Sequence, residues 1–216
     1  MILIGMFDSP FVRRVAVSAT LLGFAFEHRN WSVGKDFDRI REYNPLGRVP
    51  TLVLDSGEAL IESGMILDWL DEQAGPSRAL MPAAGEARRA AQCFIAMTVG
   101  TVDKGIHLVI ERVFKPEDKR HGPWIERCRT QIHGGLGELD RLCASVGDTP
   151  WLLGDAISQA DVTLACYCTY LRDAVPLDLS AYPALNERVQ RCEALETFAR
   201  LYIPFDAPVP KEAASA

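Results

Sequence analysis

The stretch Ile2-Leu3-Ile4-Gly5-Met6-Phe7-Asp8-Ser9-Pro10-Phe11-Val12-Arg13-Arg14-Val15 joins a short apolar segment to an amphipathic one through a polar hinge. Residues 2–4 are apolar and precede a glycine, which is typical of an interior strand. Ser9 is a favoured N-cap, and Pro10 is a favoured first helical residue because its missing N–H is one that a helix start leaves unpaired anyway. Apolar residues then recur at helical spacing, so the stretch predicts a strand, a hinge at Ser9 and a helix.

The hinge has the properties of an anion site. A helix N-terminus presents unpaired N–H groups and a partial positive charge, and the Ser9 hydroxyl can donate a hydrogen bond. A free thiol has a pKa of about 8.5, and lowering it by about two units requires roughly 2.7 kcal/mol. One hydrogen bond to a charged acceptor supplies about 1.5–3 kcal/mol. These residues therefore allow two interpretations, a Ser9 that activates a bound thiol and a Ser9 that only caps a helix.

Length and charge limit the classes of protein that the chain can belong to. Its 216 residues are enough for one large domain or two modest ones. The net charge of -6 argues against a nucleic-acid surface, which would need a basic excess. No run approaches the roughly 18–20 apolar residues of a membrane helix, and the polar hinge interrupts the only segment that could resemble a signal peptide. We expect a cytoplasmic protein that binds neither nucleic acid nor membranes.

The cysteines and histidines do not form a metal-binding pattern. The six cysteines are Cys93, Cys128, Cys143, Cys166, Cys168 and Cys192. No two of them make a Cys-x-x-Cys pair, and the four histidines do not stand at zinc-ligand spacing. We expect reduced, mostly buried thiols and no metal site.

The first 77 residues alternate between predicted strands and helices. After the first helix we expect a strand, a short exposed helix, an apolar strand, a short edge strand and a helix, over residues 24–31, 35–43, 51–54, 58–61 and 62–75. Strand, helix and strand in that order imply a parallel pair with a right-handed crossover. The turn Asp55-Ser56-Gly57 implies that the last strand pairs back antiparallel. The sequence predicts an α/β domain over residues 1–77, with a four-stranded mixed sheet and helices on it.

The second part of the chain is helical almost throughout. Long helices are expected at 86–114 and 124–143, and shorter ones at 162–171 and 184–192. Ser158 followed by Asp161 approximates a capping box, so we assign both residues to folding rather than catalysis. The prediction is an all-helical bundle domain over residues 84–206, followed by a proline- and alanine-rich tail, 207–216, that we expect to be loosely ordered.

Pro50 follows Val49 at the start of the predicted third strand, where a proline cannot donate to the sheet. A cis bond between the two would turn the backbone N–H and C=O of Val49 outward, free to pair with an extended peptide. A trans proline on an edge strand fits the sequence as well. Both alternatives are open at the level of sequence.

Three motifs, in this order and spacing, resemble the glutathione transferase superfamily, in particular its bacterial and plant members that use serine. They are Ser9-Pro10-Phe11-Val12-Arg13-Arg14-Val15, Asn44-Pro45-Leu46-Gly47-Arg48-Val49-Pro50-Thr51-Leu52 and Ile61-Glu62-Ser63-Gly64-Met65-Ile66-Leu67-Asp68-Trp69-Leu70. The resemblance covers essentially the whole chain. It implies a thioredoxin-like first domain that binds glutathione, a site for a small hydrophobic electrophile between the domains, and a homodimer.

The resemblance assigns the catalytic role to Ser9, whose hydroxyl would donate to the glutathione sulfur. Ser9-Pro10-Phe11-Val12 stands where glutaredoxin-like relatives carry Cys-Pro-x-Cys, so thiol–disulfide exchange through a protein cysteine is not expected there. Tyrosine-type members carry their tyrosine near the end of the first strand, where this chain has Met6 and Phe7. Ser9 is therefore the catalytic candidate of the first domain.

The glutathione-binding residues that the resemblance implies are Phe11, Arg48, Val49, Pro50, Glu62 and Ser63. The backbone of Val49 would pair with the cysteinyl unit, and Glu62 with Ser63 would hold the charged γ-glutamyl end at a helix N-terminus, in agreement with the anion-site argument. Arg48 stands where the family often has a basic residue near the glycyl carboxylate, and a solvated loop arginine fits that position as well.

Three functions follow from these observations. The first is a glutathione transferase that conjugates glutathione to small hydrophobic electrophiles in detoxification. The second uses the same thiolate for isomerisation, dehalogenation or peroxide reduction. The third is a non-catalytic interaction protein that keeps the fold, and it predicts a degraded glutathione site, whereas Ser9, Val49-Pro50 and Glu62-Ser63 are all present.

Overall fold

The computed structural model describes residues 1–175 and 177–205. The opening stretch forms β1 (Ile2–Ile4) and α1 (Pro10–Leu21), as its pattern predicts. The rest of the first part consists of β2 (Glu27–Arg29), α2 (Phe37–Arg41), β3 (Thr51–Val53), β4 (Ala59–Ile61) and α3 (Ser63–Ala74). The sheet has the order β2-β1-β3-β4, with β1 parallel to β2 and antiparallel to β3, and β3 antiparallel to β4. The predicted four-stranded mixed sheet is confirmed.

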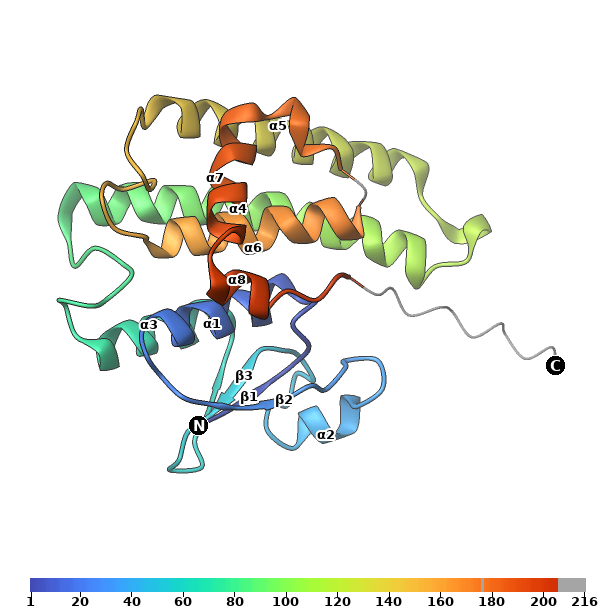
Figure 1. Ribbon diagram of the computed structural model, residues 1–216. Helices are drawn as coiled ribbons and strands as arrows, with labels where there is room; N and C mark the ends of the chain where they lie inside the picture. The colour runs from blue at the N-terminus through green and yellow to red at the C-terminus, as the bar shows by residue number, and fades with distance from the viewer. Residues whose placement is uncertain (176, 206–216) are drawn as a thin grey trace.

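The two faces of the sheet are covered by different helices. Leu3, Leu52 and Leu60 are aligned across β1, β3 and β4 and belong to the main core. Figure 1 shows α1 and α3 between the sheet and the helical domain, with α2 on the opposite side of the sheet. Successive strand residues point to opposite faces, and Ile4 accordingly packs with Ile40 of α2 in a second, smaller core.

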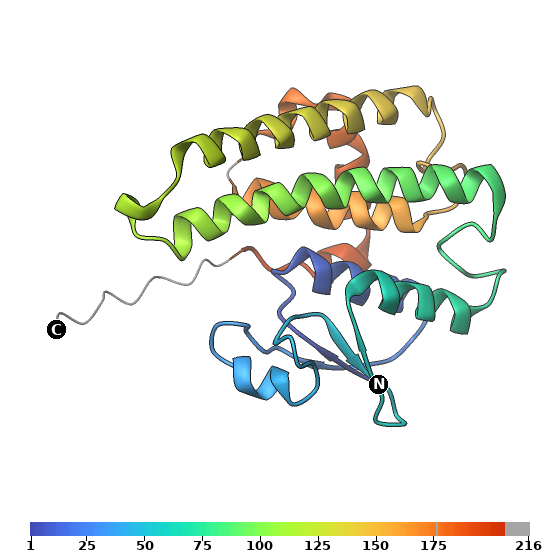
Figure 2. The same cartoon turned by 180° about the vertical axis from the view of Figure 1, so that it is seen from behind.

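The second part is a helical domain, also as predicted. It comprises α4 (Gly85–Val113), η1 (Glu117–Lys119), α5 (Gly122–Ser145), α6 (Gln159–Ala174), η2 (Leu179–Ala181), α7 (Pro183–Glu193) and α8 (Glu196–Arg200). Figure 2 shows α4 and α5 running side by side along the domain. The sequence did not predict α8 or the two 3₁₀ turns, which are elements of only three to five residues. The predicted tail, 207–216, lies outside the described residues.

The segment before α6 folds as the capping-box pattern predicts. The carboxylate of Asp161 accepts hydrogen bonds from the backbone N–H of Ser158 at 2.9 Å, from its hydroxyl at 2.6 Å and from the N–H of Leu152 at 2.9 Å. Burial raises the pKa of Asp161. Both polar residues hold the start of a nearly fully buried helix, so their role is structural.

The helix α4 differs from the expectation that no segment of the chain is long and apolar enough to cross a membrane. It is long enough to cross a membrane, and the mean hydropathy of its most apolar 18-residue window is 1.5. Counting uninterrupted apolar runs misses this, because a few polar residues break the run without lowering the average much. A core helix of a soluble protein meets the same measure, and α4 lies along α5 and α6. Only 33% of that window is buried, however, which leaves apolar surface uncovered in this single chain.

Arg13 of α1 connects the first domain to the end of the chain. Its guanidinium forms two hydrogen bonds with the carboxylate of Glu193, at 2.8 and 2.7 Å. It also donates to the carbonyl oxygens of Phe198 at 2.9 Å and Leu201 at 3.2 Å. Only 2% of Arg13 is exposed. A buried guanidinium needs such partners. The hydrogen bonds of Arg13 therefore hold α7 and α8 against α1.

We predict that Arg13→Met lowers the free energy of unfolding by about 3–5 kcal/mol. The change leaves two carbonyl oxygens without their donor and leaves the Glu193 carboxylate with the Thr169 hydroxyl but no positive charge. Urea unfolding measures the change. Arg141→Met is the matched control, since Arg141 pairs with Glu138 on the exposed face of α5 and its removal should leave stability near the wild-type value. Equal losses in the two variants would contradict the structural role of Arg13.

Candidate functional site

Ser9 stands at the hinge between β1 and α1, with extended backbone angles (φ −73°, ψ 123°) and Pro10 in the first helical turn. Its backbone is fully used, since its N–H donates to the Met6 carbonyl at 3.2 Å and its C=O accepts from Arg13 at 2.9 Å. Its hydroxyl makes no capping hydrogen bond. Ser9 thus occupies the N-cap position without capping through its side chain, which leaves the hydroxyl available to a ligand.

A pocket lies at one end of the sheet, next to the first turn of α3. The six residues that the resemblance implies for glutathione all line it: Phe11, Arg48, Val49, Pro50, Glu62 and Ser63. Asn44, Leu46 and Ile61 complete its walls. Ser9 is not among the lining residues and lies at the start of the helix that also carries Phe11. The fold therefore gathers residues from three separate parts of the first domain around one cavity.

The loop before β3 is held by Asn44, which the sequence did not single out as a site residue. The buried side chain of Asn44 donates to the carbonyl of Arg48 at 2.9 Å and to the hydroxyl of Thr51 at 3.3 Å. The Val49–Pro50 bond is cis, which decides the alternative left open above. Within residues 1–175 and 177–205, no hydrogen bond uses the N–H or C=O of Val49. Arg48 is exposed at the rim.

Glu62 and Ser63 form the start of α3. Glu62 has φ 71°, a value that residues other than glycine rarely adopt, and its carboxylate accepts from the N–H of Gly64 at 2.9 Å. The hydroxyl of Ser63 donates to the same carboxylate at 3.1 Å. Strained backbone of this kind is concentrated at functional sites. An exposed carboxylate beside a helix N-terminus can receive an ammonium group and a carboxylate together, as an amino-acid end carries them.

Behind Ser63 lies a buried guanidinium that the sequence analysis did not assign to the site. The Nη2 of Arg14 donates to the hydroxyl oxygen of Ser63 at 2.7 Å, and only 4% of Arg14 is exposed. Its guanidinium carbon is 5.1 Å from the ring centre of Tyr167 on α6. A guanidinium has no acceptor, so the Ser63 proton is directed away from Arg14, to the carboxylate of Glu62. The signal available in the sequence was the pair Arg13-Arg14 inside a helix whose other residues are mostly apolar.

Two buried polar atoms near Ser63 have no hydrogen-bond partner among the described residues. They are the Nε of Arg14 and the hydroxyl oxygen of Tyr167. Burial raises the pKa of Tyr167, with the Arg14 charge acting in the opposite direction. Its phenol is therefore neutral at physiological pH. The ring also packs edge-on against Phe11, with ring centres 5.2 Å apart, so the helical domain supports the wall of the pocket.

The surface between the domains begins at the hinge. Phe7 and Asp8 face Tyr170 and Asp173 of α6 across a small gap that Phe205 also lines. Burial raises the pKa of Tyr170, and the Asp8 charge adds to the effect.

The buried cysteines are not suited to act as nucleophiles. All six are free, and five are buried. Burial raises the pKa of Cys143 and Cys166 to about 12, so both are protonated at neutral pH. Among residues 1–175 and 177–205, no three His, Cys, Asp or Glu side chains are grouped as metal ligands would be.

Family models match both parts of the chain. Residues 3–78 match the glutathione S-transferase N-terminal domain, and residues 122–187 match the glutathione S-transferase C-terminal domain. The chain belongs to the glutathione transferase superfamily.

Individual relatives agree with this family. The chain is 28% identical to the uncharacterized GST-like protein YibF of Escherichia coli K12, over 94% of this chain and 98% of YibF. It is 29% identical to the maleylacetoacetate isomerase of Pseudomonas aeruginosa, over 80% of this chain and 82% of the isomerase. The crystal structure of a glutathione S-transferase from Methylobacterium radiotolerans, in complex with glutathione sulfonate, superposes with a TM-score of 0.85 and 29% identity, covering 100% of this chain and 98% of that one.

We predict that Ser63→Ala lowers the free energy of unfolding by about 1–3 kcal/mol, because the buried Arg14 loses its hydrogen-bond acceptor. Urea unfolding measures the change, and Ser56→Ala in the exposed β3–β4 turn is the control, with stability expected close to wild type. Wild-type stability in Ser63→Ala would show that Arg14 does not depend on this hydroxyl.

Proposed function

We propose that the protein is a glutathione transferase that binds glutathione in the pocket beside α3, stabilises its thiolate with Ser9 and conjugates it to small hydrophobic electrophiles. One observation carries the proposal. The cavity lined by Phe11, Val49, Pro50, Glu62 and Ser63 adjoins the helix that begins at Ser9, whose hydroxyl does not cap that helix. Solved relatives in the family hold glutathione or glutathione sulfonate, which supports glutathione as the co-substrate.

In the proposed mechanism the chain supplies orientation and electrostatic stabilisation. The start of α3, with the Glu62 carboxylate and the Ser63 hydroxyl, holds the γ-glutamyl end, and the backbone of Val49 pairs with the cysteinyl unit. The glutathione sulfur is then presented to the N-terminus of α1, where the Ser9 hydroxyl donates to it. A larger thiolate fraction and the proximity of the electrophile accelerate the reaction without a covalent bond to the protein.

A glutathione-dependent isomerase is the second candidate, because the chain is similar to a maleylacetoacetate isomerase. The same thiolate would add to the substrate and leave again after rotation about a bond. Product analysis separates the two functions, since conjugation consumes glutathione stoichiometrically and isomerisation regenerates it. Dehalogenation and peroxide reduction would also be distinguished by their products. A non-catalytic role for the fold is less well supported, since Val49-Pro50 and Glu62-Ser63 still line a pocket beside the Ser9 helix.

We further propose a cytoplasmic homodimer that uses the exposed side of α4. Apolar or small side chains are exposed there at helical spacing, namely Ala90, Cys93, Ala96, Met97 and Gly100. Met65 at the start of α3 is 52% exposed. Exposed apolar side chains that share one face of a helix support an interface there. Gel filtration with light scattering tests the association, and a charge introduced by Met97→Glu should yield monomers.

We predict that Ser9→Ala binds glutathione but raises the pKa of the bound thiol by about 1–2 units, because it removes a hydrogen bond of about 1.5–3 kcal/mol to the thiolate. Calorimetric titration measures binding, and ultraviolet difference spectra over a pH series measure the thiolate. Ser56→Ala serves as the control and should titrate like wild type. Absence of glutathione binding in the wild-type protein at millimolar ligand would refute the proposed function, and an unchanged thiol pKa in Ser9→Ala would refute the role of Ser9.

A further inference from the structure

The hinge that leads to Ser9 belongs to neither β1 nor α1, so its position depends on the contacts that residues 5–8 make. The N–H of Gly5 donates to the carbonyl of Arg29 at 3.0 Å, which continues the pairing of β1 with β2. The N–H of Ser9 donates to the carbonyl of Met6 at 3.2 Å. The carbonyl of Gly5, in contrast, takes its partner from a side chain.

That side chain is His28, on β2. Its Nε2 lies 2.7 Å from the carbonyl oxygen of Gly5. A carbonyl oxygen can only accept, so Nε2 carries the hydrogen and His28 is the donor. His28 is aligned with Leu3 in the β1–β2 pair. Aligned residues of neighbouring strands point to the same face of a sheet, so the imidazole lies on the face that α1 and α3 cover.

The same imidazole also holds Phe7. The two rings are stacked, with their centres 3.8 Å apart and their planes 5° from parallel. Phe7 is 9% exposed and lines the gap that separates the hinge from Tyr170 of α6. His28 therefore fixes the hinge at two points, the backbone of Gly5 and the ring of Phe7, and Ser9 follows Phe7 by two residues.

Gly5 is packed tightly between two parts of the first domain. Its φ is 132°, a conformation that favours glycine. A Cβ atom on Gly5 would lie 2.6 Å from a side-chain carbon of Val12 on α1 and 2.8 Å from one of Val49. The backbone that His28 binds thus lies in contact with the first turn of α1 and with the loop that ends at the cis bond. A displacement of Gly5 would disturb both the Ser9 helix and Val49.

We propose that His28 is a positioning residue for the reaction, because its Nε2–H and its ring hold the hinge in the place where the Ser9 hydroxyl meets the glutathione sulfur. This inference rests on the proposed function. Among residues 1–175 and 177–205, those that line the glutathione pocket and the gap between the domains do not include His28. His28 therefore acts through Ser9. A hydrogen bond weakens steeply with distance and angle, so a small displacement of the hydroxyl is enough to lower the thiolate fraction.

The main test is the pKa of the glutathione thiol bound to His28→Phe, measured by ultraviolet difference spectra over a pH series. The phenyl ring keeps the stack on Phe7 but offers no donor to Gly5. We expect the thiol pKa to rise by about 0.5–1 unit, less than in Ser9→Ala, because a displaced hydroxyl still makes a weaker hydrogen bond. His28→Gln places an amide N–H near the position of Nε2 and should recover at least about half of that shift.

A double variant tests whether His28 acts through Ser9. Residues that act as one unit are not additive. Ser9→Ala combined with His28→Phe should therefore give the same thiol pKa as Ser9→Ala alone, within about 0.2 unit. Additive shifts in the double variant would overturn the proposal, because they would mean that His28 acts on the thiolate independently of Ser9.

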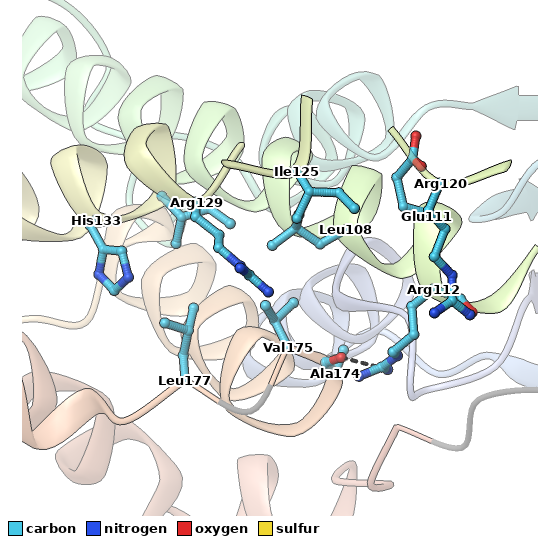
Figure 3. Close-up of a pocket in the computed structure, with 11 residues that line it drawn as sticks. Leu108, Glu111, Arg112, Arg120, Ile125, Arg129, His133, Ala174, Val175 and Leu177 are labelled. Carbon is cyan, nitrogen blue, oxygen red and sulfur yellow. Dashed lines mark hydrogen bonds between the residues drawn. The ribbon is translucent and has the colours of Figure 1, made fainter. Parts of the chain in front are cut away.

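His133→Phe is the matched control. The Nδ1 of His133 lies 2.7 Å from the hydroxyl of Tyr182, and the two rings are stacked with their centres 6.5 Å apart. His133 thus makes the same two kinds of contact as His28. Figure 3 shows it on α5, beside a cavity whose lining residues all belong to the helical domain. The thiol pKa in His133→Phe should equal that of wild type, and a shift as large as in His28→Phe would overturn the proposal.

The wild-type protein without glutathione gives a second measurement, which holds even if a His28 variant does not fold. Nitrogen-15 NMR of the imidazole groups should show the neutral His28 ring with its hydrogen on Nε2, and that hydrogen should exchange slowly with water. A hydrogen on Nδ1 would overturn the proposal, as would a wild-type thiol pKa in His28→Phe. Failure of the proposed function would be distinguishable, since glutathione would not bind to the wild-type protein or Ser9→Ala would leave the thiol pKa unchanged.

Discussion

Two adjacent buried arginines on α1 constrain the whole molecule. Arg13 needs a carboxylate and carbonyl oxygens, and it finds them in Glu193 and in the turns around α8. Arg14 needs an acceptor and finds the Ser63 hydroxyl at the start of α3. Because successive residues of a helix point in different directions, one short helix is tied at once to the end of the chain and to the ligand pocket. The hydrogen bonds of Arg13 and Arg14 therefore also fix the position of Ser9, which lies one helical turn before Arg13.

Much of the architecture is encoded locally and was predictable. The strand and helix of the first 21 residues, the antiparallel return at the Asp55-Ser56-Gly57 turn and the capping box at Ser158 each depend on residues close in sequence. Connection rules then give the parallel β1–β2 pair without knowledge of side-chain packing. The family resemblance added residues that periodicity alone does not reveal, such as Arg48 and Val49.

The remainder of the site depends on contacts between distant segments. Arg14 and Ser63 are 49 positions apart, and nothing in the local pattern of either names the other. Asn44 reads as an ordinary turn residue, and only the structure shows its side chain holding the backbone of Arg48. Ser9 illustrates the converse, since the sequence identifies a helix N-cap whereas the structure shows a hydroxyl that does not cap. Local preference identified the position of Ser9, and the tertiary fold determines which bonds its side chain forms.

The unequal burial of the cysteines has a practical consequence. Five thiols are buried, and burial raises the pKa of each. Cys93 alone is exposed, on α4. Alkylating reagents attack accessible thiolates, so the native protein offers a single attachment point for a fluorophore or spin label without any engineered substitution. Because that point lies on the side of α4 where Ala90, Ala96 and Met97 are exposed, a label on Cys93 reports directly on whether another surface comes to cover it.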